Sequence, residues 1–214
     1  MRKGASELTE WNHILPEKAY SFEEPDDSVI SLTKSLPKGK AALDLACGAG
    51  RHVICLAEQG FDVTGADVSV TGLKMTKERL QKRNLRANLV RCDMNHLPYA
   101  GGCFGILVCT RAIYHQRLKS IQETLLEIRR VMKGNGTLLI DFLSKNTYSY
   151  GKGIRVEEGT FMEHEGHERG IIHHYADEQE LKQLFRDFGN VRLSLRERVV
   201  DGSLRSRWVV TATS

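Results

Sequence analysis

Short apolar segments alternate with amphipathic ones from Lys40 onwards, and this alternation limits the fold more than any other feature of the sequence. The segments with strand character are residues 41–46, 63–66, 89–90, 106–109 and 137–142. Helical patterns between them cover residues 53–57, 70–83 and 118–132, the last with Gly134 just past its end. Apolar strands that lead into helices are typical of a parallel sheet covered on both faces, so the sequence predicts an α/β fold with a doubly wound sheet.

The end of the chain has a different pattern. A helix predicted after Asp177, with Glu180 completing a capping box, is followed by β-type segments at residues 191–200 and 204–211. The dipeptide Asp201-Gly202 between them is a strong hairpin signal. The expected sheet is therefore Rossmann-like, with seven strands that are mostly parallel and a C-terminal antiparallel hairpin.

The chain divides into a leader and a main domain. Residues 1–39 hold three of the four prolines and are expected to form a helical N-terminal cap, here called the leader. Residues 40–214 form the main domain. Within it, residues 144–176 contain five glycines and four of the eight histidines, with short strands expected near 160–162 and 171–174. So long an excursion in a compact domain is usually functional or mobile, so we interpret it as a lid.

Composition excludes several classes of protein. The chain has 214 residues, 41% hydrophobic and 27% charged, with a net charge of +4, which does not fit a disordered, collagen-like or coiled-coil chain. We expect neither a membrane span nor a signal peptide, because long apolar runs are absent and residues 1–10 are charged. The five cysteines include no C-x-x-C pair, which favours reduced, buried thiols in a cytoplasmic protein.

Three carboxylates mark the expected binding edge of the sheet. Asp44 opens the run Asp44-Leu45-Ala46-Cys47-Gly48-Ala49-Gly50 between the first strand and the first helix, while Asp67 and Asp93 end the second and third strands. Ligands of doubly wound sheets bind at the carboxyl ends of the strands, where glycines allow close approach and a helix offers free N–H groups. Each feature alone is equally well explained as a turn or a helix cap, but the ordered set indicates a binding site.

The same residues discriminate between nucleotide cofactors. A dinucleotide fingerprint needs a third glycine where Val53 stands, and Asp44 would repel a pyrophosphate. S-adenosylmethionine lacks phosphate and carries positive charge, so its ribose suits Asp67, its adenine suits Asp93, and its ammonium and sulfonium suit Asp44. An NAD-binding oxidoreductase and a non-catalytic S-adenosylmethionine-binding module remain as alternatives.

The run from Asp44 to Gly50 resembles motif I of the class I S-adenosylmethionine-dependent methyltransferases. Residues 65–69 resemble the second motif of that family and residues 93–99 the third, while 104–109 and 131–136 match its fourth strand and the turn before its fifth. The resemblance covers residues 40 to about 142. It is closest to the small-molecule methyltransferases that include quinone-biosynthesis and tellurite-resistance enzymes, and it implies an enzyme that uses S-adenosylmethionine.

The resemblance also implies a set of cofactor contacts. Asp67 would bind the ribose hydroxyls, Asp93 the adenine amino group and the Met94 backbone the adenine ring, with the glycines against the methionine and ribose portions. Alanine at position 46 stands where the family often has glycine, a change that a small side chain tolerates. The expected cofactor-binding residues are Asp44, Ala46, Cys47, Gly48, Gly50, Asp67, Val68, Asp93, Met94 and Thr110.

Candidates for the acceptor side follow the fourth strand or lie in the lid. Methyl transfer is an in-line displacement in which the protein supplies orientation and a dry site, with a base only if the acceptor must lose a proton. His115 titrates near neutral pH and is a candidate base, although capping of the next helix explains it as well. The expected catalytic residues are His115, Tyr114 and His174, and the expected substrate-binding residues are Arg111, Tyr175, Trp11 and Tyr20.

Two other ligand classes are disfavoured. The lid histidines at 164, 167, 173 and 174 lack i, i+4 spacing and have no cysteine nearby, so we expect solvated side chains and no metal site. The basic residues of segment 70–86 have no interleaved aromatics, and Cys109-Thr110-Arg111 replaces the motif of amino-directed nucleic-acid methyltransferases. The sequence therefore favours a small-molecule acceptor over nucleic acid, and it leaves the oligomeric state open.

Overall fold

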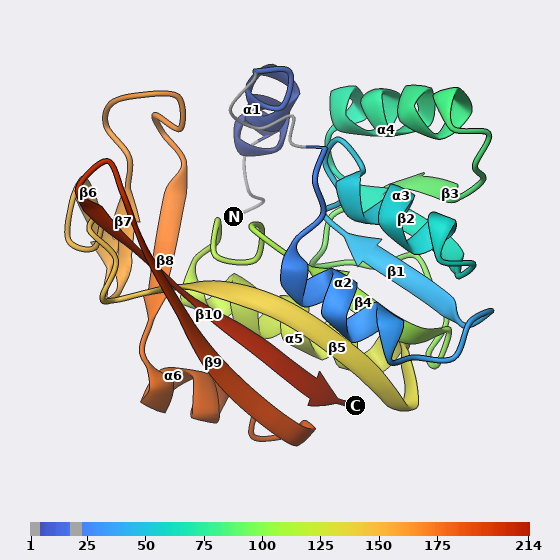
Figure 1. Cartoon of the computed structure of the whole chain (residues 1–214). Coiled ribbons are helices and arrows are strands. Elements are labelled where there is room, and N and C mark those ends of the chain that lie inside the picture. Colours follow the sequence, from blue (N-terminus) through green and yellow to red (C-terminus); the bar gives the residue numbers. More distant parts are fainter. Residues whose placement is uncertain (1–4, 18–22) are drawn as a thin grey trace.

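A computed structural model describes residues 5–17 and 23–214 and has the expected α/β fold (Figure 1). Its core sheet has the order β3-β2-β1-β4-β5, with β1 (Ala41–Leu45), β2 (Asp62–Asp67), β3 (Asn88–Arg91), β4 (Phe104–Cys109) and β5 (Met132–Ser144) all parallel. Beyond β5, β10 (Ser203–Thr213) runs antiparallel to it and pairs with β9 (Gly189–Val200). The mostly parallel sheet with a C-terminal antiparallel hairpin is thus confirmed.

The sheet has ten strands and not seven, because the lid adds three. β8 (Ile172–Ala176) pairs in parallel with the end of β5, β7 (Thr160–Met162) is antiparallel to β8, and β6 (Ile154–Glu157) is antiparallel to β7. The two short strands expected in the lid are present. β6 was not expected, because its four residues are only partly covered or exposed and show no apolar face in the sequence.

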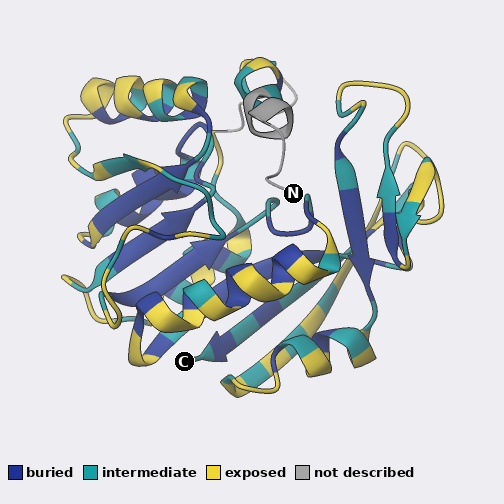
Figure 2. Ribbon diagram, turned by 180° about the vertical axis from the view of Figure 1, so that it is seen from behind, coloured by how far each residue is buried: buried dark blue, intermediate teal, exposed yellow. Residues whose placement is uncertain are grey.

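Helices cover both faces of the core sheet, as expected for a doubly wound fold. The helices on one face are α2 (Asp27–Lys34), α3 (Arg51–Glu58) and α4 (Val70–Lys82), which pack with Ala42, Ile106 and Leu139. On the other face, α5 (Leu118–Val131) and α6 (Glu178–Leu184) pack with Leu43, Leu107 and Leu138. Figure 2 shows buried and exposed residues alternating along α5. Consecutive residues of each strand point alternately into the apolar layers on the two faces of the sheet. These strands are therefore apolar along their whole length.

Local signals at the ends of the elements are mostly confirmed. Asp201 and Gly202 have φ values of 48° and 73°, the left-handed pair that a tight hairpin turn requires. Asp177 Oδ1 accepts the N–H of Glu180 at 2.9 Å and caps α6. The helix predicted over residues 118–132 is α5, which ends at Val131, but Gly134 lies within β5 because the strand begins directly at Met132.

The first helix, α1 (Ala5–Ile14), lies between α4 and the β6–β8 strands (Figure 1). Asn12 attaches it to the start of α4, since Asn12 Oδ1 accepts from Ser69 Oγ at 2.9 Å and from the Thr71 N–H at 3.2 Å. In the described part of the chain, no helix has the length and apolar character needed to cross a membrane. All five cysteines are free.

Candidate active site

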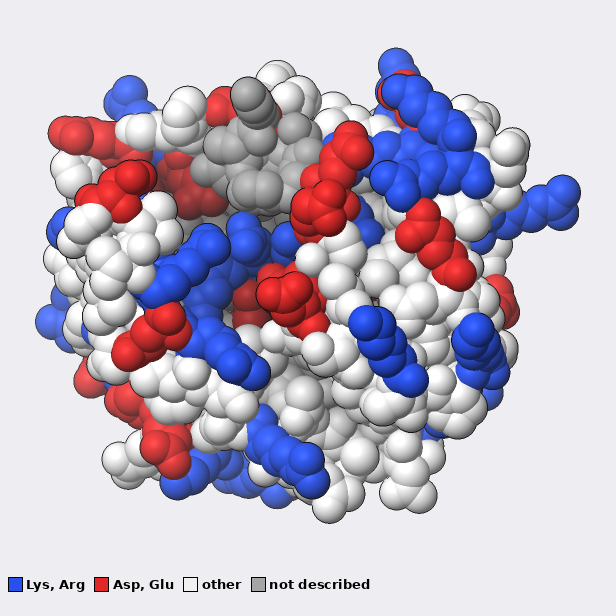
Figure 3. Space-filling model, in the orientation of Figure 1, with Lys and Arg blue, Asp and Glu red and all other residues white. Residues whose placement is uncertain are grey.

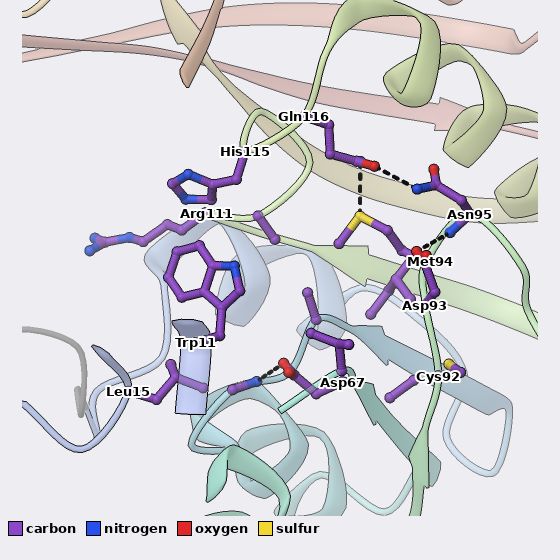
Figure 4. Close-up of a pocket in the computed structure, with 16 residues that line it drawn as sticks. Trp11, Leu15, Asp67, Cys92, Asp93, Met94, Asn95, Arg111, His115 and Gln116 are labelled. Atoms are coloured by element: carbon purple, nitrogen blue, oxygen red, sulfur yellow. Dashed lines mark hydrogen bonds between the residues drawn. The ribbon is translucent and has the colours of Figure 1, made fainter. Parts of the chain in front are cut away.

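A cavity of about 150 Å³ opens at the carboxyl ends of β1 to β4, where the sequence places the carboxylates (Figure 4). Six of the ten expected cofactor-binding residues line it: Ala46, Gly48, Asp67, Val68, Asp93 and Met94. Trp11 and Leu15 of the leader close its outer side. The strand ends and the leader thus enclose one site.

The glycine loop is held in an unusual backbone conformation. Ala46, Gly48 and Gly50 have φ values of 57°, 52° and 82°, which lie in the left-handed region. The hydroxyl of Thr76 on α4 donates to the Gly48 carbonyl at 2.8 Å. The Gly48 N–H donates to Asp67 Oδ2 at 2.7 Å. The loop therefore takes its shape from α4 and from the end of β2.

Asp67 is the central polar group of the cavity. Its other oxygen, Oδ1, accepts the Ser69 N–H at 2.7 Å, so the carboxylate is fixed by two backbone donors. Burial raises the pKa of Asp67, while the hydrogen bonds from Ser69 and Gly48 oppose that shift. Because each carboxylate oxygen has two lone pairs, acceptor capacity remains toward the cavity that Asp67 lines.

A polar cluster joins the loop after β3 to the loop after β4. Asp93 Oδ1 accepts the Asn95 N–H at 3.0 Å, which leaves its other oxygen beside the cavity. The amide of Gln116 donates to Met94 Sδ at 3.0 Å and accepts from Asn95 Nδ2 at 2.8 Å (Figure 4). Gln116 and Asn95 were not identified in the sequence, although Asn95 follows Asp93-Met94 directly. They fix one wall of the cavity.

A second cavity, of about 450 Å³, shares Trp11, Ala46, Gly48 and His115 with the first. The expected cofactor residues Cys47, Gly50 and Thr110 line it, together with Tyr114 and Arg111. Four arginines border it: Arg51, Arg111, Arg205 and Arg207. Figure 3 shows Lys and Arg side chains gathered around a hollow on this face.

The arginines are oriented by acidic and polar partners. Arg111 has a φ of 55°, and its backbone N–H donates to Asp141 Oδ1 at 2.6 Å. Asp141 Oδ2 accepts from Arg207 at 2.9 Å, so one carboxylate on β5 positions both residues. Arg205 packs over the ring of Tyr148 at 4.1 Å. Arg205 and Arg207 were not identified in the sequence, because they reach the site on β10, more than 150 residues after motif I.

Asp44 is not among the described residues that line either cavity, which corrects its expected direct contact with the cofactor. It is 1% exposed, and burial raises its pKa to about 7, although Arg51 lowers it. His52 is a neighbouring titratable group, with its Nδ1 3.9 Å from Asp44 Oδ1. His52 Nε2 accepts the Asp26 N–H at 3.1 Å, so the neutral ring carries its proton on Nδ1, toward Asp44.

Replacing Asp44 by Asn is expected to change how stability depends on pH. The folded protein keeps a proton on Asp44 between about pH 4 and 7 that the unfolded chain has released, so ionisation of this group destabilises the fold as pH rises. Asparagine removes that penalty. In thermal melts without cofactor, the Tm of Asp44→Asn relative to wild type should rise by on the order of 10 °C from about pH 5 to pH 8. A constant difference in Tm would contradict this expectation.

His115 lies where expected but is a poorer base than expected. Its ring is 4.8 Å from that of Trp11, 4.5 Å from that of Tyr114 and 4.7 Å from that of His173. Burial and the neighbouring His173 lower the pKa of His115 to about 3. The expectation that it titrates near neutral pH is therefore wrong in this structure, and its conjugate acid is too strong for efficient general-base catalysis at pH 7. Burial raises the pKa of Tyr114, so this hydroxyl stays protonated.

His174 and Tyr175 do not reach the cavities, which corrects two predictions. His174 is fully buried, and its ring nitrogens lie 2.8 Å from Thr160 Oγ1 and 2.8 Å from Glu180 Oε1. Tyr175 packs its ring against Tyr150 and donates its hydroxyl to Ser149. Both side chains stabilise the lid. Of the leader candidates, Trp11 lines both cavities and Tyr20 lies outside the described residues.

The four lid histidines divide into two kinds. His164 and His167 are 55% and 69% exposed, as expected for solvated residues. His173 and His174 are buried, so the expectation of solvation is wrong for them. Consecutive residues of a strand point to opposite faces. β8 therefore sends His174 into the lid interior and His173 toward His115.

Comparison with known proteins identifies the domain. Residues 42–136 match a family model described as a methyltransferase domain. The putative methyltransferase YqeM of Bacillus subtilis is 35% identical over 109 residues, which are 50% of this chain and 44% of that protein. The ubiquinone biosynthesis O-methyltransferase of Rickettsia akari is 26% identical over 54% of this chain and 45% of its own length. The match thus spans less than half the length of these two relatives.

The fold likeness extends over more of the chain. The crystal structure of an S-adenosylmethionine-dependent methyltransferase from Methanosarcina mazei matches with a TM-score of 0.76 and 21% identity, over 89% of this chain and 98% of that one. The glycine loop and the carboxylates at the ends of β2 and β3 lie within the 42–136 segment that the family model matches. Residues 42–136 are thus similar to a methyltransferase domain, on a fold shared with an S-adenosylmethionine-dependent methyltransferase of known structure.

Proposed function

We propose that the protein transfers a methyl group from S-adenosylmethionine to a small-molecule acceptor. The observation that carries this proposal is Asp67, which is fixed by the Gly48 and Ser69 N–H groups at the edge of a cavity and retains acceptor capacity. A ribose offers two vicinal hydroxyl donors to such a carboxylate. Neither a phosphate nor a pyrophosphate is a suitable ligand for Asp67.

The other cavity residues fit the remaining parts of the cofactor. Asp93 offers an oxygen to the adenine amino group, and Met94 and Val68 form the apolar walls for the ring. Gly48 and Gly50 leave room for the methionine portion. The cofactor supplies an electrophilic methyl group on a positively charged sulfur. The protein orients it toward the second cavity and keeps water away.

The second cavity supports a small, polar or anionic acceptor. Arg111 and Tyr114 line it, as do Arg205 and Arg207 from β10. Guanidinium groups suit carboxylate or phosphate oxygens because they offer several N–H donors in a plane. A small molecule is also consistent with the name of the Rickettsia akari relative, a ubiquinone biosynthesis O-methyltransferase. Nucleic acid is disfavoured, because the basic residues of α4 lack interleaved aromatics for base stacking.

The leader (residues 1–39) and the lid (residues 144–176) complete the acceptor site in this proposal. Trp11 and Leu15 of the leader line both cavities, and Glu168 of the lid lines the second. The main domain, residues 40–214, in which the lid is an insertion, holds the cofactor. The five free cysteines favour a reducing compartment, and we infer a cytoplasmic protein.

Two measurements test the proposed function. Titration calorimetry should show binding of S-adenosylhomocysteine but not of NADH. Radiolabelled S-adenosylmethionine should then transfer its methyl group to members of a panel of small carboxylates, phosphates, phenols and amines. Binding of NADH alone would favour an oxidoreductase. Tight binding of S-adenosylhomocysteine with no transfer to any acceptor would favour a non-catalytic binding module.

A further inference from the structure

The lid brings a second set of polar groups to the rim of the acceptor cavity. His173 on β8 is 4% exposed, and its Nε2 lies 2.9 Å from Glu168 Oε2, in the turn that precedes β8. Glu168 lines the second cavity. The ring of His115, in the loop after β4, meets the ring of His173 edge to face at 4.7 Å. Two segments that are distant in the sequence, the loop after β4 and the turn that leads into β8, therefore meet at one place.

These three residues offer a ligand set for a metal ion. One atom from each of His115, Glu168 and His173 lies within 4.8 Å of the others. Two histidines and one carboxylate form the common triad of zinc hydrolases and of non-haem iron sites. The sequence did not predict this ligand set. The adjacent residues His173 and His174 were considered together, but the His174 side chain faces the other way, toward Thr160 and Glu180.

We propose that His115, Glu168 and His173 bind one divalent transition-metal ion, such as Zn²⁺, at the rim of the acceptor cavity. Metal–ligand bonds of about 2.0–2.2 Å place neighbouring ligand atoms roughly 3.0–3.5 Å apart. The separation of 2.9 Å between His173 and Glu168 is close to this range. The widest separation must shorten by roughly 1–2 Å, which a rotation of the His115 or Glu168 side chain can supply.

The surroundings of His173 match those of a metal ligand. A ligating histidine usually turns its other ring nitrogen toward a carboxylate, which fixes the tautomer. His173 Nδ1 lies 3.9 Å from Glu163 Oε1 and has no hydrogen-bond partner among the described residues. Thus Glu163 stands behind His173 while Glu168 stands beside its Nε2. The same two carboxylates supply negative charge for a divalent cation in a cavity that also contains arginines.

A metal ion held by three protein ligands keeps coordination positions for another molecule. Here those positions face the cavity that contains Arg207 and Tyr114. An ion at this place would bind an oxygen of the acceptor and favour its deprotonated form.

Metal content and binding can be measured without methyl transfer. The full chain is treated with EDTA, dialysed against micromolar ZnCl₂, and its zinc content is measured by inductively coupled plasma mass spectrometry. In a second experiment, Co²⁺ replaces Zn²⁺ and its binding is followed by visible absorption. We expect one metal ion per wild-type chain and no stoichiometric metal in Glu168→Gln or His173→Gln. His164→Gln and His167→Gln, which alter exposed histidines of the same lid, should bind as wild type does.

Binding of S-adenosylhomocysteine to each variant serves as the test of folding. Absence of zinc and cobalt from the wild-type chain would overturn the proposal, as would equal metal binding by His173→Gln and wild type. Loss of metal in His164→Gln or His167→Gln, with full retention in Glu168→Gln, would assign the ion to another place and overturn it as well. Metal binding without S-adenosylhomocysteine binding would contradict the proposed function and leave the metal site supported.

Discussion

Asp67→Ala should weaken the binding of S-adenosylhomocysteine by about 100-fold or more, because two hydrogen bonds to a charged carboxylate are lost at roughly 1.5–3 kcal/mol each. The substitution also leaves the Gly48 and Ser69 N–H groups without their partner, so the glycine loop loses its link to β2. Titration calorimetry at one fixed salt concentration measures the change. We expect the Kd for S-adenosylhomocysteine to rise, while one molecule still binds per chain.

Asp62→Ala is the matched control, since Asp62 stands at the exposed start of the same strand. It should leave the affinity unchanged. Asp67→Asn, which keeps the shape and one carbonyl oxygen, should fall between Asp67→Ala and wild type. Wild-type affinity in Asp67→Ala, with a normal melting curve, would show that the ribose is not bound at Asp67.

Gly50→Ala should destabilise the protein by about 3–5 kcal/mol, the sum of backbone strain and overpacking. Gly50 has a φ of 82°, and a methyl group there would lie 2.5 Å from Thr76 Oγ1 and 2.8 Å from Thr76 Cβ. Thr76 is not free to move away, because its hydroxyl donates to the Gly48 carbonyl. Thermal melting should show a decrease in Tm of roughly 10 °C for a chain of this size.

Gly102→Ala separates the two causes. Gly102 has a φ of 70°, similar to that of Gly50, but a methyl group there would meet nothing within 4 Å. It should therefore cost only the backbone strain, roughly 1 kcal/mol. If Gly50→Ala lowered the stability no more than Gly102→Ala does, the close approach of Gly50 to Thr76 would not exclude a side chain at position 50.

The parts of the molecule that the sequence predicted best depend on local patterns. The strands and helices of the core follow from apolar periodicity, and the carboxylates of Asp67 and Asp93 follow from their places at strand ends. Glycine spacing identified the loop that ends at Gly50. Each signal lies within about ten residues, so no knowledge of distant contacts was needed.

The parts that were missed depend on contacts between distant segments. Arg205 and Arg207 reach the second cavity because β10 runs antiparallel along β5, and Glu168 reaches it because β8 pairs with the end of β5. The pKa of His115 depends on its burial beside His173, which the sequence around residue 115 does not reveal. The prediction that His173 and His174 share one environment was wrong, because consecutive residues of a strand point to opposite faces.

The length of β5 limits how the acceptor can enter. Its first part pairs with β4, and its last residues, Leu143 and Ser144, pair with β8 of the lid. The lid is thus a backbone-bonded continuation of the central sheet, and swinging it outward as a flap would break main-chain hydrogen bonds. The leader helix is attached near the site through the side chain of Asn12. The lid side of the site is therefore held by main-chain hydrogen bonds, whereas the contacts of Asn12 with the start of α4 are made by a side chain.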